Sequence, residues 1–215
     1  MPEYPEPRRV GIHDILQSVG PDVDRRQAND VGLAHAIALL ELLHPRQAAL
    51  ALVVLTTGTD AAAAIGMRWR EIDEATGLAT LYDPALMFER VVPLPKITYD
   101  AVRRLSFDGK DTVFAEDLDD AWPYRLVTEF DDGVSAEVVP ETFEEGFLRT
   151  AGRLRMLQTV VDQIAPPPFA VRSGQIERYS DVVEAVTAHF VPLIRDARRA
   201  VAKQHRAGAG HDVSS

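Results

Sequence analysis

The sequence predicts a mainly α-helical domain with a small antiparallel β-sheet, that is, an α+β fold. Apolar residues recur at helical spacing along most of the chain. Two short stretches, 78–82 and 89–94, are strand-like, and the loop between them contains Asp83-Pro84, as expected for a β-hairpin. The length of 215 residues is enough for one domain with its own hydrophobic core.

The two ends of the chain differ in composition from the rest. Residues 1–9 are rich in proline, and residues 207–215 are rich in Gly, Ala and Ser. Such segments bury too little apolar surface to fold, so we expect disordered tails on a single domain over residues 10–206.

Four helices are expected in the first half of the domain. Their ranges are 12–19, from Asn29 or Asp30 onward, 45–56 and 60–69. Either Asn29 or Asp30 would be a good N-cap. The helix over 45–56 is apolar on nearly every side, which predicts burial, and Gly58 suits the position after its end. Asp60 would lie at the favourable end of the dipole of the fourth helix.

The second half is expected to contain three helices and two further strands. The predicted helices cover 97–105, 141–164 and 180–204, and the predicted strands cover 112–115 and 125–130. Three consecutive prolines, 166–168, would end the second of these helices, and the last helix must bend near Pro192.

Composition excludes several classes of protein. No apolar run approaches the roughly 18 residues that a membrane span needs. Residues 1–9 hold no apolar segment, so no signal peptide is expected. The chain has no cysteine, which excludes disulfides and thiol chemistry and suits a reducing cytosol. The sequence therefore predicts a cytoplasmic protein without membrane contact.

The net charge of −10 is concentrated in one segment. Between Asp111 and Glu145 there are twelve acidic residues and one basic residue, Arg125, so this segment carries −11 and the rest about +1. A protein that grips phosphates usually carries a basic face. The charge balance therefore argues against strong binding to DNA.

A resemblance to a known family begins at Thr57. The stretch from Thr57 to Asp73 reads TGTDAAAAIGMRWREID. Without a gap, it is similar in spacing to the first active-site motif of tyrosine recombinases: Thr-Gly-Leu-Arg, two residues, Glu, two residues, Gly or Ala-Leu-Arg or Lys-Trp, two residues, Ile-Asp. Residues 77–82 and 90–95 resemble the paired strands that follow in that family. The resemblance covers about residues 30–105 and is faint afterwards.

The resemblance implies a recombinase-type catalytic domain linked to DNA integration and recombination. Family enzymes attack a DNA phosphate with a tyrosine hydroxyl, while two arginines clamp the phosphate and a lysine on the hairpin protonates the leaving group. Here Asp60 stands at the first arginine position, Ala63 at the Glu position, and no lysine lies between Tyr82 and Glu89. Because a carboxylate repels phosphate, we expect no strand cleavage and regard the chain as a pseudoenzyme.

Two later segments are similar to the remaining family motifs. Residues 146–151 match His-x-Leu-Arg-His-Thr in part, which makes Arg149 a remnant of the second clamp. Residues 176–181 resemble the motif that holds the nucleophile, which makes Tyr179 its remnant. An alternative interpretation requires no relation to the family. In that case Arg149 is solvated or paired with Glu145, and Tyr179 is a residue at the edge of the core.

Other residue patterns offer little chemistry. The six histidines show no i, i+4 spacing, and no glycine-rich phosphate loop is present, so no metal or cofactor is expected. Arg68 and Arg70 are weak candidates for contact with DNA. A basic helix end, formed by Arg195, Arg198, Arg199, Lys203 and Arg206, suits the helix dipole and solubility first and phosphate contact second.

Two functions remain open on the sequence. The first is a catalytically inactive recombinase-like protein that associates weakly with DNA or binds an active recombinase. The second is a non-enzymatic interaction or structural module that uses the acidic segment 111–145 as its contact surface. The oligomeric state is not predicted.

Overall fold

The computed structural model describes residues 25–83, 87–105, 111–114, 128–129, 135–136, 140–156, 159 and 175–209. The predicted N-terminal tail, the helix expected over 12–19 and most of the acidic segment lie outside these residues. The predicted C-terminal tail begins too early, because residues 207–209 are still helical as the end of α8, and only 210–215 lie outside the described residues.

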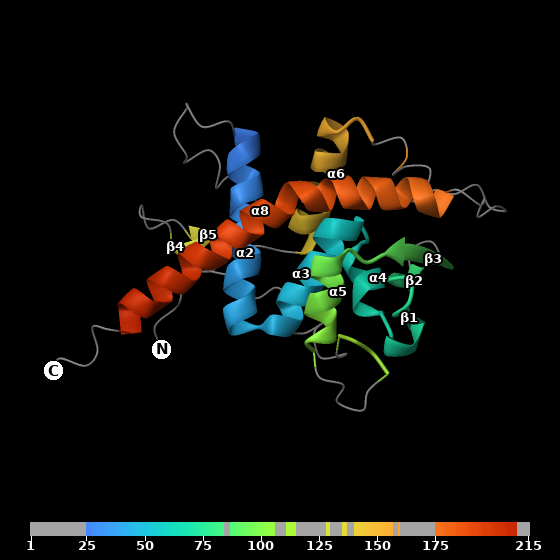
Figure 1. Cartoon of the computed structure of the whole chain (residues 1–215), viewed down its shortest axis with the longest axis horizontal. Coiled ribbons are helices and arrows are strands. Elements are labelled where there is room, and N and C mark those ends of the chain that lie inside the picture. Colours follow the sequence, from blue (N-terminus) through green and yellow to red (C-terminus); the bar gives the residue numbers. More distant parts are fainter. Residues whose placement is uncertain are drawn as a thin grey trace, which may run out of the picture.

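The described chain is mainly helical and carries a small antiparallel sheet (Figure 1). The longer helices are α2 (Arg25–Leu43), α3 (Pro45–Thr57), α5 (Lys96–Arg103), α6 (Pro140–Arg153) and α8 (Gln175–Ala209). Between α3 and α5 lie the short helix α4 (Ala61–Ile65), a 3-10 turn (Trp69–Glu71) and the strands β1 (Ile72–Asp73), β2 (Leu78–Asp83) and β3 (Phe88–Pro93). The predicted α+β class is therefore confirmed.

Helix α3 is the centre of the core. Every residue from Gln47 to Thr57 is buried, and α3 packs against α2, α5 and α6. Pro45 occupies the first turn, where a missing N–H costs nothing. Gly58 ends the helix in the left-handed region with φ 61°, and a Cβ there would run into the ring of Phe147. The predicted buried helix and its glycine stop are both confirmed.

Helix α2 begins earlier than predicted. It starts at Arg25, so Asp30 lies inside the helix and the prediction that Asn29 or Asp30 is its N-cap is wrong. The side chain of Asp30 is instead buried, with Oδ2 2.5 Å from Nη2 of Arg153 on α6 and 2.8 Å from Nε2 of His189 on α8. A polar residue that is read as a cap from local sequence is thus used to join three helices.

The fourth predicted helix is cut short. Asp60 is its N-cap, and α4 ends at Ile65 with Gly66 as its C-cap, rather than continuing to Trp69. Beyond that point the backbone pairs with the segment 111–114: the carbonyl of Met67 accepts from the N–H of Val113, and the N–H of Trp69 donates to the carbonyl of Asp111. These long-range bonds require an extended backbone and could not be read from helical periodicity.

The three-stranded sheet has the order β1-β2-β3, with both pairs antiparallel. The predicted hairpin is confirmed as β2 and β3, in which Ala79 pairs with Val92 and Leu81 with Arg90. All four of these residues are buried, so this face of the sheet covers the core. The sequence missed β1, because its two residues are too few to show a strand period.

The second half departs further from prediction. Helix α5 agrees within two residues at each end. Of the strand predicted over 112–115, the described part forms only an isolated β-bridge between Thr112 and Arg68. Within the strand predicted over 125–130, the described part is β4 (Thr128–Glu129), which pairs with β5 (Ser135–Ala136). Helix α6 ends at Arg153 instead of reaching 164, since Arg155 takes φ 61° and the N–H of Met156 turns back to the carbonyl of Ala151.

Helix α8 is the longest element and contacts both α2 and β3. It starts five residues before the predicted 180 and contains Pro192 near its middle. Figure 1 shows α8 changing direction about midway along its length, in agreement with the expected bend. Among the described residues, none of the helices combines the length and apolar content that crossing a membrane would require.

Candidate functional site

The side chain of Tyr179 lies in the interior of the protein. It is 1% exposed, on the second turn of α8, and its hydroxyl donates a hydrogen bond to the carbonyl oxygen of Thr57 at the end of α3. Its ring lies 6.4 Å from the ring of Phe147 on α6, measured between centroids. Tyr179 therefore joins the end of α3 to α6 and α8.

The environment of Tyr179 keeps its hydroxyl protonated. Burial raises the pKa of Tyr179 to about 12, and the positive charge of Arg90 opposes that rise only in part. A tyrosine nucleophile needs a hydroxyl that can reach a substrate and lose its proton. This hydroxyl is buried and already donates its proton to a backbone carbonyl, so the observed arrangement does not present a nucleophile.

Asp60 has two structural partners. Its Oδ1 accepts a hydrogen bond from the backbone N–H of Ala63 at 2.9 Å, which caps α4. Its Oδ2 lies 3.4 Å from Nη2 of Arg90. The carboxylate at the family's arginine position thus starts a helix and balances a buried cation.

Arg90 is the site residue that sequence reasoning missed. It lies on β3, and its side chain is only 4% exposed beside Asp60. The signal was the alternation of the strand: Arg90 and Val92 share one face, and Val92 is fully buried. An arginine on an inward-facing strand position predicts a carboxylate close by, because a buried charge is rarely left alone.

The structure brings two of the three predicted catalytic remnants together. Asp60 and Tyr179 both lie close to Arg90, whose guanidinium contacts the first and whose charge acts on the second. Arg149 is placed differently. It follows Phe147 by two residues, about 200° around α6, and Phe147 faces Gly58 and Tyr179. The Cα of Arg149 therefore lies on a different side of α6 from that of Phe147.

The side chain of Arg149 is partly buried, and its role as a remnant of the second clamp stays a prediction. Its Nη1 is buried and has no hydrogen-bond partner among the described residues. The predicted pairing with Glu145 is not found among the ion pairs of this part of the chain. An unsatisfied buried donor of this kind costs about 1–3 kcal/mol.

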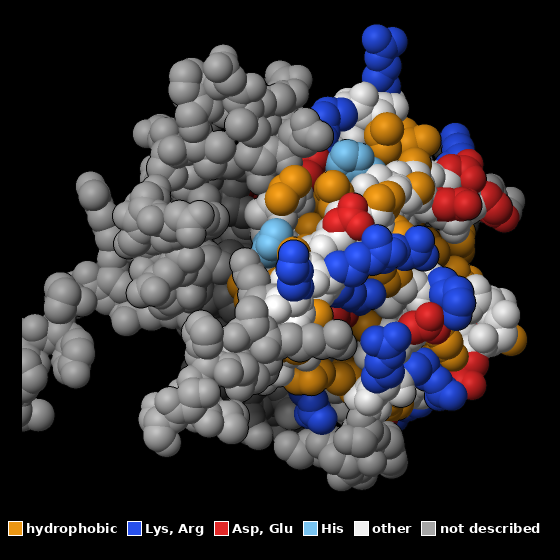
Figure 2. All heavy atoms as spheres, turned by 60° about the vertical axis from the view of Figure 1, so that its left-hand side comes forward, with side chains coloured by type: hydrophobic (Ala, Val, Ile, Leu, Met, Phe, Trp, Pro, Cys, Tyr) orange, Lys and Arg blue, Asp and Glu red, His pale blue; other side chains and the backbone are white. Residues whose placement is uncertain are grey.

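The side chains of Arg68 and Arg70, the weak candidates for DNA contact, are exposed, but both lie close to the same carboxylate, that of Asp111. Nε of Arg68 lies 4.0 Å and Nη2 of Arg70 lies 3.5 Å from Oδ2 of Asp111. Figure 2 shows basic side chains gathered on one face of the described protein, with acidic and hydrophobic side chains among them. Asp111 thus offsets part of the charge of Arg68 and Arg70, which weakens their attraction for a phosphate backbone.

No three histidine or acidic side chains of the described residues are grouped so that they could hold a metal ion. Comparisons with protein-family models, with curated proteins and with solved structures find no match for this chain.

Proposed function

We propose that this chain is a cytoplasmic, tyrosine-recombinase-like domain that does not cleave DNA and that acts by association, with an active recombinase or weakly with DNA. One observation carries the proposal: the residues that stand at the family's catalytic positions form hydrogen bonds and an ion pair within this protein. Tyr179 donates to the carbonyl of Thr57, and Asp60 caps α4 and pairs with Arg90.

The order of elements after α3 supports the recombinase-like frame. A buried helix, a left-handed glycine, an Asp-capped helix and a three-stranded antiparallel sheet follow one another from Pro45 to Pro93. The resemblance to tyrosine recombinases implies the same order: a buried helix, then the first active-site motif, then the paired strands. Asp60 and Tyr179 are 119 residues apart in sequence (179 − 60), yet the guanidinium of Arg90 contacts the first and its charge lowers the pKa of the second.

Charge favours a recombinase over DNA as the main partner. The chain carries −10 overall, and Arg68 and Arg70, the two arginines within the motif, both lie within 4.0 Å of Oδ2 of Asp111. A basic protein gains affinity for DNA by releasing counterions, whereas this chain carries a net negative charge. The alternative function, an interaction module that uses segment 111–145, is favoured by the −11 charge of that segment.

The chemical part of the proposal is tested with nicked suicide duplexes, on which an active recombinase accumulates a covalent protein–DNA adduct. We expect no adduct on denaturing gels from the natural chain or from Asp60→Arg. An adduct that forms with the natural chain and disappears in Tyr179→Phe would overturn the proposal.

The association part is tested by two binding measurements on the full chain. Co-purification with an active tyrosine recombinase is the expected result. A duplex probe shifted at about 100 mM salt, with affinity falling steeply as salt rises, would instead assign DNA as the partner. Binding to neither would favour the interaction module with an unrelated partner.

A further inference from the structure

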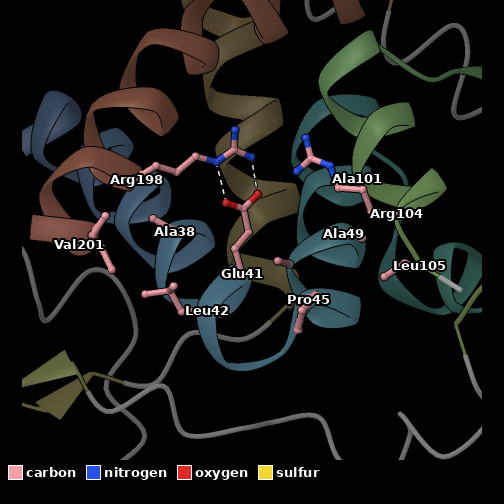
Figure 3. A pocket seen from close by; sticks show the side chains of 12 residues that line it. Ala38, Glu41, Leu42, Pro45, Ala49, Ala101, Arg104, Leu105, Arg198 and Val201 are labelled. Atoms are coloured by element: carbon pink, nitrogen blue, oxygen red, sulfur yellow. Dashed lines mark hydrogen bonds and ion pairs between the residues drawn. The ribbon is translucent and has the colours of Figure 1, made fainter. Parts of the chain in front are cut away.

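A groove of about 550 Å³ lies between α2, α3, α5 and α8 (Figure 3). Its lining includes none of Asp60, Arg90 and Tyr179, so it is separate from the site described above. Nine of its twelve lining residues are apolar, and the other three are Glu41, Arg104 and Arg198. Small-molecule sites commonly have this size and this combination of an apolar surface with a few polar groups.

One wall of the groove carries a fixed ion pair. Nε of Arg198 on α8 donates to Oε2 of Glu41 on α2 at 2.6 Å, and Nη2 of Arg198 donates to Oε1 of the same carboxylate. Both side chains are less than one-third exposed, at 31% and 24%. This two-point contact balances the charge of Arg198 and fixes its orientation.

The opposite wall carries a second guanidinium. Figure 3 shows the side chain of Arg104, at the end of α5, directed toward the same space as the Glu41–Arg198 pair. No ion pair between described residues involves Arg104. Two arginines and one glutamate leave the lining with a charge of +1. A single anion would therefore complement the groove.

The apolar lining of the groove indicates the chemistry of the rest of the ligand. Ala48 and Ala49 on α3 form part of the lining and are buried, while Leu42 at the rim is 51% exposed. Small side chains leave room for an aliphatic body, and covering Leu42 would remove apolar surface from water.

We propose that this groove binds a small amphipathic monoanion, an aliphatic body with one carboxylate, whose carboxylate pairs with Arg104 and whose body lies on the apolar lining. Guanidinium–carboxylate pairing fixes the orientation, and burial of the aliphatic body supplies most of the affinity. This site is independent of the proposed recombinase-like function.

The proposal is tested by calorimetric titration of the full chain with decanoate below its micellar concentration. Decanol and decylammonium have the same aliphatic body without the negative charge. We expect decanoate to bind at least about tenfold more tightly than decanol, and decylammonium not to bind, because Arg104 repels it. No binding of decanoate, or equal affinity for all three, would overturn the proposal.

Two matched pairs of variants locate the site. Arg104→Ala is expected to weaken decanoate about tenfold or more, whereas Arg103→Ala is expected to leave its affinity unchanged, because Arg103 bonds Glu74 at 2.5 Å and does not line the groove. Ala202→Trp, on the exposed side of α8, would fill the groove and abolish binding, and the same change at exposed Ala188 would not.

Circular dichroism establishes that each variant is folded. If Arg104→Ala fails to fold, the Ala202→Trp and Ala188→Trp pair decides the question. Decanoate binding that survives both Arg104→Ala and Ala202→Trp would overturn the assignment, as would binding of an acidic amphipathic peptide in place of decanoate.

Discussion

The hydroxyl of Tyr179 donates a hydrogen bond to the carbonyl oxygen of Thr57, 122 residues earlier in the chain. Thr57 is the last residue of α3, so its carbonyl is one of those that the helix leaves without an internal partner. The tyrosine that resembles a recombinase nucleophile thus completes the end of the central helix. In the folded protein this side chain contributes packing and a hydrogen bond.

Tyr179→Phe is therefore expected to lower the stability of the fold. The substitution keeps the ring against Phe147 but leaves the Thr57 carbonyl buried without this donor, which costs about 1–3 kcal/mol. The free energy of unfolding is measured by urea denaturation. Tyr99→Phe is the control, since Tyr99 is only partly buried and should change stability by less. An unchanged unfolding midpoint for Tyr179→Phe would show that the bond contributes nothing.

Stability is also expected to fall at high pH because of the same group. Burial raises the pKa of Tyr179 to about 12 from the ordinary tyrosine value of 10.0, so the folded state holds the proton more tightly than the unfolded state. The free energy of unfolding therefore decreases as the pH rises through this interval, by about 3 kcal/mol at most. Below a pH of about 10, Tyr179 is protonated in both the folded and the unfolded state, so it does not make the free energy of unfolding depend on pH.

The measurement is urea denaturation over a pH series, for the natural chain and for Tyr179→Phe. Other tyrosines and lysines titrate in both proteins, so the difference between the two curves isolates Tyr179. We expect that difference to shrink as the pH rises above about 10. Parallel curves would mean that Tyr179 ionises alike in the folded and unfolded states.

Local sequence predicted the elements whose signals are local. The buried helix α3, its glycine stop, the β2–β3 hairpin and α5 all follow from apolar period, a left-handed glycine and strand alternation. The early end of α4 did not follow, because it depends on hydrogen bonds from Met67 and Trp69 to the segment 111–114. The buried role of Asp30 was hidden for the same reason: its partners Arg153 and His189 lie more than a hundred residues away.

The site was predicted in part. Sequence spacing selected Asp60 and Tyr179, and both lie close to Arg90. Arg90 itself was predicted only as part of a strand, because a motif comparison identifies which residue stands at a position and not which group balances its charge. Arg149 was selected on a short match, and the helical period places it on a different side of α6 from Phe147.

Asp60→Ala is expected to destabilise the fold by about 3 kcal/mol. It removes the cap on α4, worth about 1 kcal/mol, and leaves the nearly buried Arg90 without this carboxylate. Asp60→Asn keeps an oxygen for the cap and removes only the charge, so its loss should be smaller. Asp60→Arg should be the most destabilising of the three, because it places a second guanidinium beside Arg90.

These three variants are compared by urea denaturation, with Asp60→Asn combined with Arg90→Met as the control. The double variant removes the charge of Arg90 together with that of Asp60, so it should recover part of the stability that the protein loses in Asp60→Asn alone. Additive losses in the double variant would mean that Asp60 and Arg90 do not stabilise each other.

Gly58→Ala is expected to be far more harmful than the same change at Gly32. Gly58 has φ 61°, where a side chain strains the backbone, and its Cβ would overlap the ring of Phe147. Gly32 lies inside α2 with open space around it, so alanine there should stabilise the helix by about 0.5–1 kcal/mol. Thermal unfolding should show a loss of about 2 kcal/mol or more at Gly58 and a small gain at Gly32. Equal effects at the two glycines would contradict the close packing of α6 against the end of α3, and with it the frame that holds Tyr179 in place.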